Sequence, residues 1–357
     1  MNYVMLKEVC SINMGQSPDS NSYNETGEGV PFFQGNADFG ERYPIVRKWC
    51  TAPTKMAKPE DILISVRAPI GAMNYAKEDC CIGRGLAALT PDKSKVSPEF
   101  IFWLLKGKNG ELNSKGTGST FKAIGRKVLE ETLVPNIDLS TQIKCSASLE
   151  KVYSIIQYRK QQLQQLDELV KARFVEMFGD PVANEKGWKT KPLLEMGSCK
   201  NGMNFHYEDS GVEINCLGVG DFKDYSTILD TSVLPTVSLN EMPTEDYMLK
   251  DEDIVFVRSN GNKALVGRSV AVYPGDIPTT FSGFCIRYRK TDESLNIPYL
   301  LRVLKTESIR RKMAGRGANI QNLNQQILGT LIIPVPPIEL QNQFAAFVEQ
   351  VDKSKFI

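Results

Sequence analysis

The chain has 357 residues, of which 41% are hydrophobic and 24% are charged, and its formal net charge is +1. This length predicts two or three domains, and the near-neutral charge gives no bulk signature of a nucleic-acid-binding protein. Eight cysteines are scattered along the chain, and the one histidine, His206, is too few for a zinc site of the Cys/His type. We expect free thiols, no metal and a cytoplasmic location, with no apolar run near the ~20 residues of a membrane span.

Residues 1–139 are predicted to form a first, β-rich domain. Glycine and proline residues punctuate this part of the chain and separate short apolar runs, a pattern typical of strands between turns. The strand candidates are 30–33, 62–66 and 86–89. One helix is expected at 98–107, where Pro98 suits a first helical turn and aromatic and leucine residues follow.

Residues 140–180 change character and predict a spacer helix. They contain no proline, Ser140 or Thr141 can cap the start, and Gly179 ends the run. At 1.5 Å per residue such a helix is about 55 Å long. Its apolar side chains have coiled-coil spacing, so it needs a partner helix to cover them. This stripe consists of Val152, Ile156, Leu163, Leu166, Val170, Phe174 and Met177.

A second β-rich domain is expected at 181–338, and residues 339–357 begin a second spacer helix. The strand candidates of this domain are 212–217, 254–257, 269–272 and 284–288, and its helix begins near Pro298. We expect the two spacer helices to run antiparallel. The second helix stops about 20 residues short of the first in the aligned repeat. A shortened chain and a naturally brief helix both remain open.

The two halves of the sequence repeat each other. The glycine-rich segment 116–121 returns as 315–320, Val-Pro at 134–135 returns as Ile-Pro at 333–334, and Gln142 returns as Gln341, each 199 positions later. A period this long indicates two whole domains rather than a solenoid, whose repeats run about 20–50 residues. The predicted fold class is therefore α+β, with two similar β-rich domains joined by long antiparallel coiled-coil helices.

Common local signatures of catalysis are missing from the sequence. There is no GxxxxGK[ST] phosphate loop and no GxSxG turn, and HExxH needs a second histidine. The Asp/Asn-Pro-Pro-aromatic motif of amino-group methyltransferases is also absent, because Val and Ile flank the Pro-Pro pair at 336–337. His206 is better explained as a surface or hydrogen-bonded residue than as a base. An enzyme with an unrecognised spatial site is the remaining catalytic alternative.

Several segments together resemble the specificity (S) subunit of type I restriction-modification systems. They are Gly-Thr-Gly-Ser-Thr at 116–120, Val-Pro at 134–135 ahead of the long helix, 166–169, 173–180 and the Ile-Pro-x-Pro-Pro element within 331–341. The resemblance covers essentially the whole chain. It implies two target-recognition domains, each of which reads one half of a bipartite DNA site, and helices that set the spacing and dock modification subunits. It also implies no catalytic role and no cofactor for the chain, with S-adenosylmethionine and ATP on the partner subunits and a restriction subunit as a further partner.

Basic and amide side chains beside glycine are the candidates for contact with double-stranded DNA. Arginine can pair bidentately with guanine and asparagine with adenine, and glycine lets backbone approach phosphate closely. The alternatives are a solvated surface residue or a turn partner at each position, and a tight turn as the reason for the glycine repeat. A scaffold or inhibitory module that binds modification subunits without reading DNA is the alternative function. The candidates are Arg67, Arg84, Lys115, Thr120, Lys122 and Arg126 in the first domain, and Arg258, Asn260, Lys263, Arg268, Arg316, Asn319 and Gln321 in the second.

Overall fold

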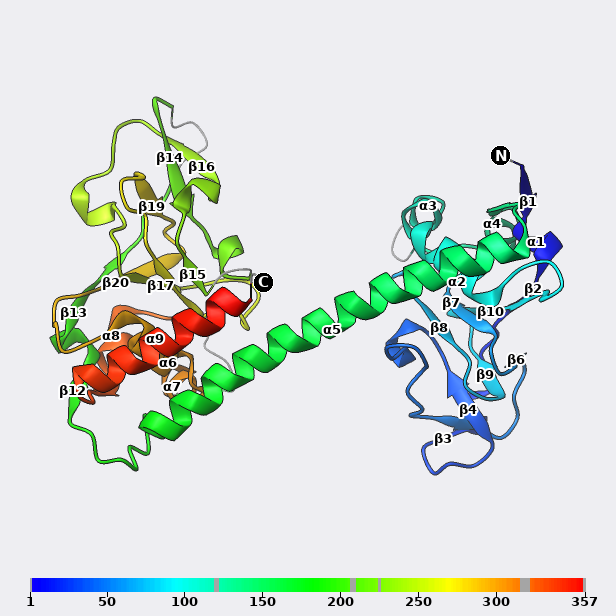
Figure 1. The fold of residues 1–357 in the computed structure, drawn as a ribbon, viewed down its shortest axis with the longest axis horizontal. Coiled ribbons are helices and arrows are strands. Elements are labelled where there is room, and N and C mark those ends of the chain that lie inside the picture. Colours follow the sequence, from blue (N-terminus) through cyan, green and yellow to red (C-terminus); the bar gives the residue numbers. More distant parts are fainter. Residues whose placement is uncertain (1, 119–121, 206–209, 224–225, 315–321, 356–357) are drawn as a thin grey trace. The chain divides into compact units, whose positions relative to one another are not determined.

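The computed structural model describes residues 2–118, 122–205, 210–223, 226–314 and 322–355 (Figure 1). It divides into two compact units, Met1–Arg159 and Lys160–Ile357, so the division falls inside the long helix α5. None of the described helices is long and apolar enough to cross a membrane. His206 and four of the candidate DNA-binding residues lie outside the described residues: Thr120, Arg316, Asn319 and Gln321.

Two sheets and a group of helices build the first unit. Strands β2, β10, β7 and β8 form a four-stranded antiparallel sheet, and β3, β5, β4, β9 and β6 form a five-stranded one; β1 pairs with β11. The strands are β1 Tyr3–Met5, β2 Cys10–Met14, β3 Tyr23–Asn24, β4 Val30–Phe33, β5 Trp49–Cys50, β6 Met56–Ala57, β7 Ile62–Ser65, β8 Met73–Tyr75, β9 Cys80–Ile82, β10 Leu86–Pro91 and β11 Leu133–Pro135. The helices are α1 Leu6–Val9, α2 Pro98–Gly107, α3 Asn109–Ser114, α4 Arg126–Glu130 and α5 Leu139–Phe178.

Strand β7 shows why strands of the first unit appear in the sequence as unbroken apolar runs. Side chains alternate between the two faces of a strand, and both faces of β7 are covered. Ile62 and Ile64 belong to the core beneath α1, α2 and α4, whereas Leu63 belongs to a second core that includes Phe33 and Ile82 of the five-stranded sheet. A strand buried on both faces has no polar alternation, which accounts for the unbroken apolar run.

The second unit also has two sheets and a group of helices, but its sheets contain different numbers of strands. Strands β13, β20, β17, β18 and β15 form one sheet, β16, β14 and β19 form another, and β12 pairs with β21. The strands are β12 Thr190–Pro192, β13 Gly197–Asn201, β14 Val212–Leu217, β15 Thr227–Ile228, β16 Thr236–Leu239, β17 Asp253–Val257, β18 Ser269–Val272, β19 Thr279–Phe281, β20 Cys285–Lys290 and β21 Ile332–Pro334. The helices are α6 Ile297–Lys305, α7 Glu307–Ala314, α8 Gln325–Gly329 and α9 Ile338–Ser354.

Hydrogen bonds confirm the internal repeat and its register. The side chain of Gln142 accepts from the backbone N–H of Ser97 at 2.9 Å and donates to the carbonyl of Ile137 at 2.9 Å. Gln341 accepts from the N–H of Asn296 at 2.9 Å and donates to the carbonyl of Pro336 at 2.8 Å. All three pairs of positions differ by 199. This register makes Ser97 and Asn296 equivalent helix caps, so α6 begins at Ile297, one residue before Pro298.

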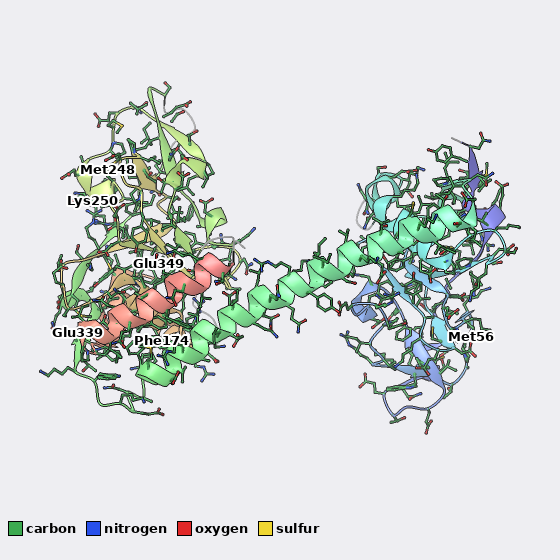
Figure 2. All side chains as sticks on the ribbon, viewed as in Figure 1. Met56, Phe174, Met248, Lys250, Glu339 and Glu349 are labelled. Carbon is green, nitrogen blue, oxygen red and sulfur yellow. The ribbon has the colours of Figure 1, made fainter. Side chains whose placement is uncertain are left out.

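The long helix α5 packs against α9 only near its own C-terminus. The ring of Phe344 lies 5.5 Å from that of Phe174 and 5.6 Å from that of Phe178, and Phe174 is marked beside α9 in Figure 2. Lys355 at the other end of α9 forms an ion pair with Asp167 at 2.7 Å. Residue numbers therefore rise in opposite directions along the two helices, as expected for an antiparallel pair.

The prediction of a long coiled coil is not borne out along the whole stripe. Phe174 is 1% exposed, but Val152 is 55% and Ile156 is 46% exposed. The physical reason is length: α5 has 40 residues and α9 has 17, and 17 residues cover only about 25 Å. The structure thus supports one long helix and a short antiparallel contact.

Candidate nucleic-acid interface

In the first unit, Val66 joins two loops that carry candidate residues. Its N–H donates to the carbonyl of Gly85 at 2.9 Å, and its own carbonyl accepts from the N–H of Ile124 at 2.9 Å. These two bonds bring together three exposed candidates from separate parts of the chain: Arg67, Arg84 and Lys122. We call the backbone arrangement around residue 66 the first loop junction.

Glycine is required where the neighbouring loops meet this junction. A Cβ added to Gly15 would overlap the carbonyl oxygen of Gly83, and one added to Gly85 would overlap that of Gln34. The glycines therefore permit close backbone packing under Arg84. The structure therefore explains these glycines by the close packing of the loops, and not by a glycine-rich loop that binds phosphate.

Two further candidates in this unit, Lys115 and Arg126, make polar contacts with neighbouring parts of the chain. The carboxylate of Glu111 accepts from Lys108 and Lys115 at 2.6 Å each, and these two lysines lower the pKa of Glu111 to about 2. The guanidinium of Arg126 donates to the carbonyl of Ile12 and lies 3.3 Å from the carboxylate of Glu130. Lys115 and Arg126 are exposed, but both also stabilise local structure.

The second unit builds the same junction on Arg258. The N–H of Arg258 donates to the carbonyl of Phe284 at 2.7 Å, and its carbonyl accepts from the N–H of Leu323 at 2.8 Å. Phe284 and Leu323 are the equivalents of Gly85 and Ile124, because both lie 199 positions further along. Arg258 thus takes the place of Val66, and we call this arrangement the second loop junction.

Four described candidates lie on the loop that follows β17. Arg258 is partly buried and its guanidinium donates to the carbonyl of Gly283 at 3.4 Å, so this side chain also braces the neighbouring turn. Asn260 accepts from the N–H of Asn262 at 2.7 Å. Lys263 and Arg268 are exposed, and Arg268 donates to the carbonyl of Phe222 at 3.5 Å.

Phe284 is a candidate for DNA contact that we did not predict from the sequence. We predicted that a strand begins at this residue, but β20 begins at Cys285 and Phe284 lies in the preceding turn. Its side chain is 61% exposed. The prediction was wrong because Phe284 is the first residue of the apolar run that enters β20, and an apolar run in the sequence does not show at which residue the strand begins. An exposed aromatic beside Arg258 can make apolar contact with a thymine methyl group.

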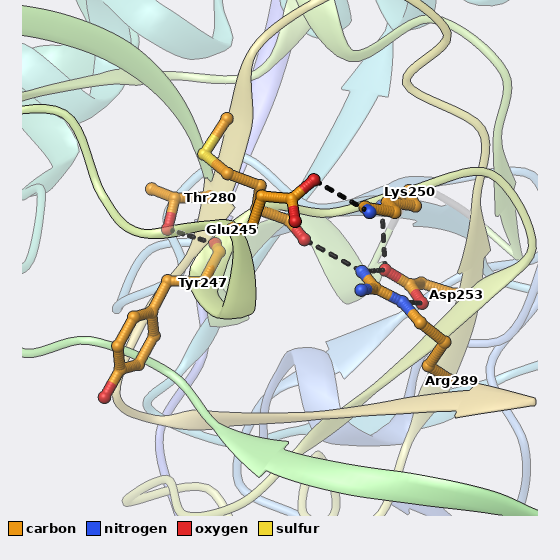
Figure 3. Close-up of polar contacts among 7 residues, drawn as sticks. Glu245, Tyr247, Lys250, Asp253, Thr280 and Arg289 are labelled. Carbon is orange, nitrogen blue, oxygen red and sulfur yellow. Dashed lines mark hydrogen bonds and ion pairs between the residues drawn. The ribbon is translucent and has the colours of Figure 1, made fainter.

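A buried ion pair links the first residue of β17 to β20 (Figure 3). Arg289 donates to both carboxylate oxygens of Asp253, at 2.8 and 2.7 Å, and to the carbonyl of Met248 at 2.9 Å. The side chain of Asp253 is fully buried. In the first unit the equivalent Asp61 accepts from the hydroxyl of Thr90 at 2.6 Å. The two units keep the carboxylate and change its partner.

The described residues offer little for catalysis. They contain no group of three or more His, Cys, Asp or Glu side chains arranged to hold a metal ion. Burial raises the pKa of the thiols of Cys10, Cys80, Cys199 and Cys216 to about 12. Such thiols stay protonated at neutral pH and are poor nucleophiles.

The family model of the type I restriction modification DNA specificity domain matches residues 1–168 and 185–357. The chain belongs to this family. Each of the two matches contains one loop junction and the start of one of the helices α5 and α9, so the family's repeat and the structural repeat coincide.

Relatives support the same assignment. The putative MjaX specificity subunit of Methanocaldococcus jannaschii is 42% identical over 160 residues, which are 45% of this chain and 38% of that protein. The chain therefore matches well under two thirds of that relative's length. The StySPI specificity subunit of Salmonella potsdam is 24% identical over 335 residues, covering 86% of this chain and 71% of that protein. The crystal structure of a type I S subunit from M. genitalium has the same fold, with a TM-score of 0.58, 15% identity and coverage of 99% and 90%.

Proposed function

We propose that this specificity-domain protein is the DNA-recognition subunit of a type I restriction-modification complex. Each domain reads one half of a bipartite site in double-stranded DNA. The observation that carries the proposal is the duplicated loop junction, in which the same backbone hydrogen bonds recur in both units. Exposed cations lie on the loops that these bonds join, Arg67, Arg84 and Lys122 in the first unit and Lys263 and Arg268 in the second. Side chains on such loops read base edges in the major groove, and phosphate contacts fix the register.

The chemistry of the complex is assigned to partner subunits. Modification subunits dock on the chain and bind S-adenosylmethionine, and a restriction subunit supplies ATP-dependent steps in the cytoplasm. The chain itself is non-catalytic and carries no cofactor. The near-neutral net charge of +1 fits this division, because partners that enclose the duplex contribute part of the phosphate neutralisation.

Helix α5 sets the distance between the two recognition domains. Insertion of one helical turn adds about 5.4 Å, which corresponds to between one and two base pairs at 3.4 Å each. We therefore expect such an insertion to lengthen the non-specific spacer of the target while leaving both half-sites unchanged. A change in the half-sites themselves would contradict this role for α5.

The test is the methylation pattern of the assembled complex. The chain is combined with its modification subunits, and methylated adenines are mapped for the wild type, for Arg67→Ala with Arg84→Ala, and for Asn260→Ala with Lys263→Ala. We expect each double variant to relax one half-site only, at a cost of about 1–3 kcal/mol for each base that a replaced side chain reads. Lys127→Ala, which removes an exposed cation on α4, is the matched control.

Three outcomes would reject the proposal. Methyl transfer by the purified chain alone would make it an enzyme. An assembled complex without salt-dependent, sequence-selective binding would favour the scaffold or inhibitory module. If both double variants methylate the same sites as the wild type, the loop junctions do not take part in sequence recognition.

A further inference from the structure

The second unit holds a cavity of about 760 Å³ with an unusual excess of cations. The end of α5, helices α6 and α7 and the loop after β17 line it. Its carboxylates are Asp180 and Glu307. Its cations are Lys171, Lys263, Arg302, Lys305, Arg310 and Arg311. We call it the α5–α7 cavity.

The carboxylates of the cavity are already used by other groups. Asp180 accepts from the backbone N–H groups of Val182 at 2.8 Å and Ala183 at 3.0 Å. Glu307 forms an ion pair with Arg311 on the same helix. Among the described residues, neither carboxylate forms an ion pair with Arg302 or Lys305 of α6, and neither contributes to the pKa shifts of these two cations.

Three cations of the α5–α7 cavity lack a carboxylate partner among the residues that the structure describes. The Nε atom of Arg302 is buried without a hydrogen-bond partner. Arg310 donates to the carbonyl of Val266 at 3.1 Å, and we find no hydrogen bond or ion pair for Lys305 within the described ranges. The nearby carboxylates pair with other lysines: Glu168 with Lys171 at 3.6 Å, and Asp167 and Asp352 with Lys355 at 2.7 and 2.8 Å.

The first unit shows how the same lysine is accommodated when the chain supplies its own partners. Lys106 is the equivalent of Lys305, 199 positions earlier. Its ammonium lies 4.9 Å from the ring centroid of Trp103 and 4.1 Å from that of Tyr153, so cation–π attraction stabilises it. In the second unit the equivalents of these two rings are Arg302 and Asp352.

The absence of these rings leaves Lys305 in an unfavourable setting. Burial, followed by the charge of Arg302, lowers the pKa of Lys305 to about 8, although Asp352 and Asp167 oppose this shift and Lys355 adds to it. Lys305 is only partly exposed, and a partly desolvated cation without a carboxylate partner is less favourable than one in water. Such a feature is more readily explained by an anion that completes the site than by a contribution to folding.

The cavity also reaches the candidate DNA interface. Lys263, on the loop of the second junction, is one of its lining residues. The charge of Arg268 acts on Arg310 and lowers the pKa of that guanidinium below its usual range, after the larger effect of burial. The cations of the cavity and those of the loop are therefore neighbours.

We propose that the α5–α7 cavity binds a phosphate group, and that the DNA backbone beside the second half-site supplies it. The inference rests on the proposed function for its DNA source. Arginine and lysine are strong charge-assisted donors to phosphate oxygens, and Arg302, Lys305 and Arg310 have donors to offer. Free phosphate has the same chemistry, so the experiment separates the two sources.

The first arm measures thermal unfolding of the full chain in inorganic phosphate and in chloride at equal ionic strength. We expect phosphate to raise the melting temperature of the second unit in the wild type, since a ligand stabilises the state that binds it. Lys305→Met should abolish this response. It should also be at least as stable as the wild type in chloride, because it removes a desolvated charge; a purely structural lysine would give a less stable variant. Lys106→Met is the control and should keep the phosphate response.

The second arm measures the affinity of the wild type and of Lys305→Met for duplex DNA at a series of salt concentrations. Lys305→Met should reduce the slope of log affinity against log salt by about 0.9, one phosphate contact, and leave sequence preference unchanged. The wild type then loses about threefold more affinity than the variant between 50 and 200 mM salt.

The outcomes distinguish this proposal from the proposed function. No phosphate response in the wild type overturns the cavity as a phosphate site, even if the half-site variants behave as expected. A phosphate response with an unchanged DNA salt slope assigns the site to free phosphate and overturns the DNA source. Loss of modification-subunit binding in Lys305→Met, with neither phosphate effect, assigns the cavity to an acidic protein surface instead.

Discussion

The ion pair between Arg289 and Asp253 gives a direct test of how the two units differ. In both units a strand presents a buried aspartate opposite the same position of its neighbour: Ile254 pairs with Tyr288 as Ile62 pairs with Leu89. The next residue is Arg289 in the second unit and Thr90 in the first, and each donates to its aspartate. Replacing Arg289 by threonine therefore grafts the partner of the first unit onto the second.

The structure sets the expected magnitudes. Arg289→Ala leaves the fully buried carboxylate of Asp253 with the N–H of Lys250 at 2.8 Å as a remaining donor, and breaking a buried pair in this way costs about 3–5 kcal/mol. Arg289→Thr restores one hydroxyl donor to the carboxylate. A hydrogen bond to a charged group contributes about 1.5–3 kcal/mol, so the threonine variant should lose only about 1–2 kcal/mol.

Differential scanning calorimetry of the full chain measures both variants, because each unit has its own core and gives its own transition. For a unit of this size 1 kcal/mol shifts the melting temperature by about 2–4 °C. Arg289→Ala should lower the transition of the second unit by about 10 °C and Arg289→Thr by about 4 °C. Thr90→Ala should lower only the other transition. Equal losses for the alanine and threonine variants would refute the idea that the hydroxyl can replace the guanidinium.

Three further predictions concern the second unit. Phe344→Ala should cost about 3–5 kcal/mol in urea unfolding, because Phe344 is fully buried against Phe174; a loss below 1 kcal/mol would mean that the α5–α9 contact is not formed. Gln341→Ala should cost about 2 kcal/mol because it leaves the N–H of Asn296 without its acceptor, and an unchanged urea midpoint would contradict this. The pKa of Lys305 is lowered to about 8, so the unfolded chain binds more protons between pH 8 and 10.5. The unfolding free energy of the wild type should therefore rise relative to Lys305→Met by about 3 kcal/mol across this window, and a constant difference would contradict the shift.

Much of the fold could be predicted because burial on two faces and repetition both leave marks in a sequence. The strand at β14, the strand at β18 and the helix at α2 agree with the predictions at both ends. The repeated Gln142 and Gln341 indicated equivalent helix entries, and both glutamines satisfy the backbone of a neighbouring helix cap. A polar residue that recurs at a fixed spacing was thus a sign of an identical backbone geometry.

Other features depend on contacts that no local pattern encodes. The stripe of α5 predicts that a partner is needed, but whether Val152 is covered depends on the length of a second helix far away in the chain. The α5–α7 cavity was not predicted, because its cations come from helices and a loop that become neighbours only in the fold. One signal was present: the lysine at 106 and 305 repeats, whereas the aromatic residues at 103 and 153 do not.

The loop junctions suggest how two recognition domains with the same backbone arrangement can recognise different half-sites. The loop between β7 and β8 runs from 66 to 72, whereas the one between β17 and β18 runs from 258 to 268 and is four residues longer. The bonds that anchor the two loops are the same, so the extra residues change the reach and side chains of the reader without changing its support. Exchange of residues 66–72 for 258–268 should therefore alter recognition by the first domain while the domain still folds. A swapped chain that no longer folds would show that these loops stabilise their own sheets, and that recognition cannot be varied independently of the fold.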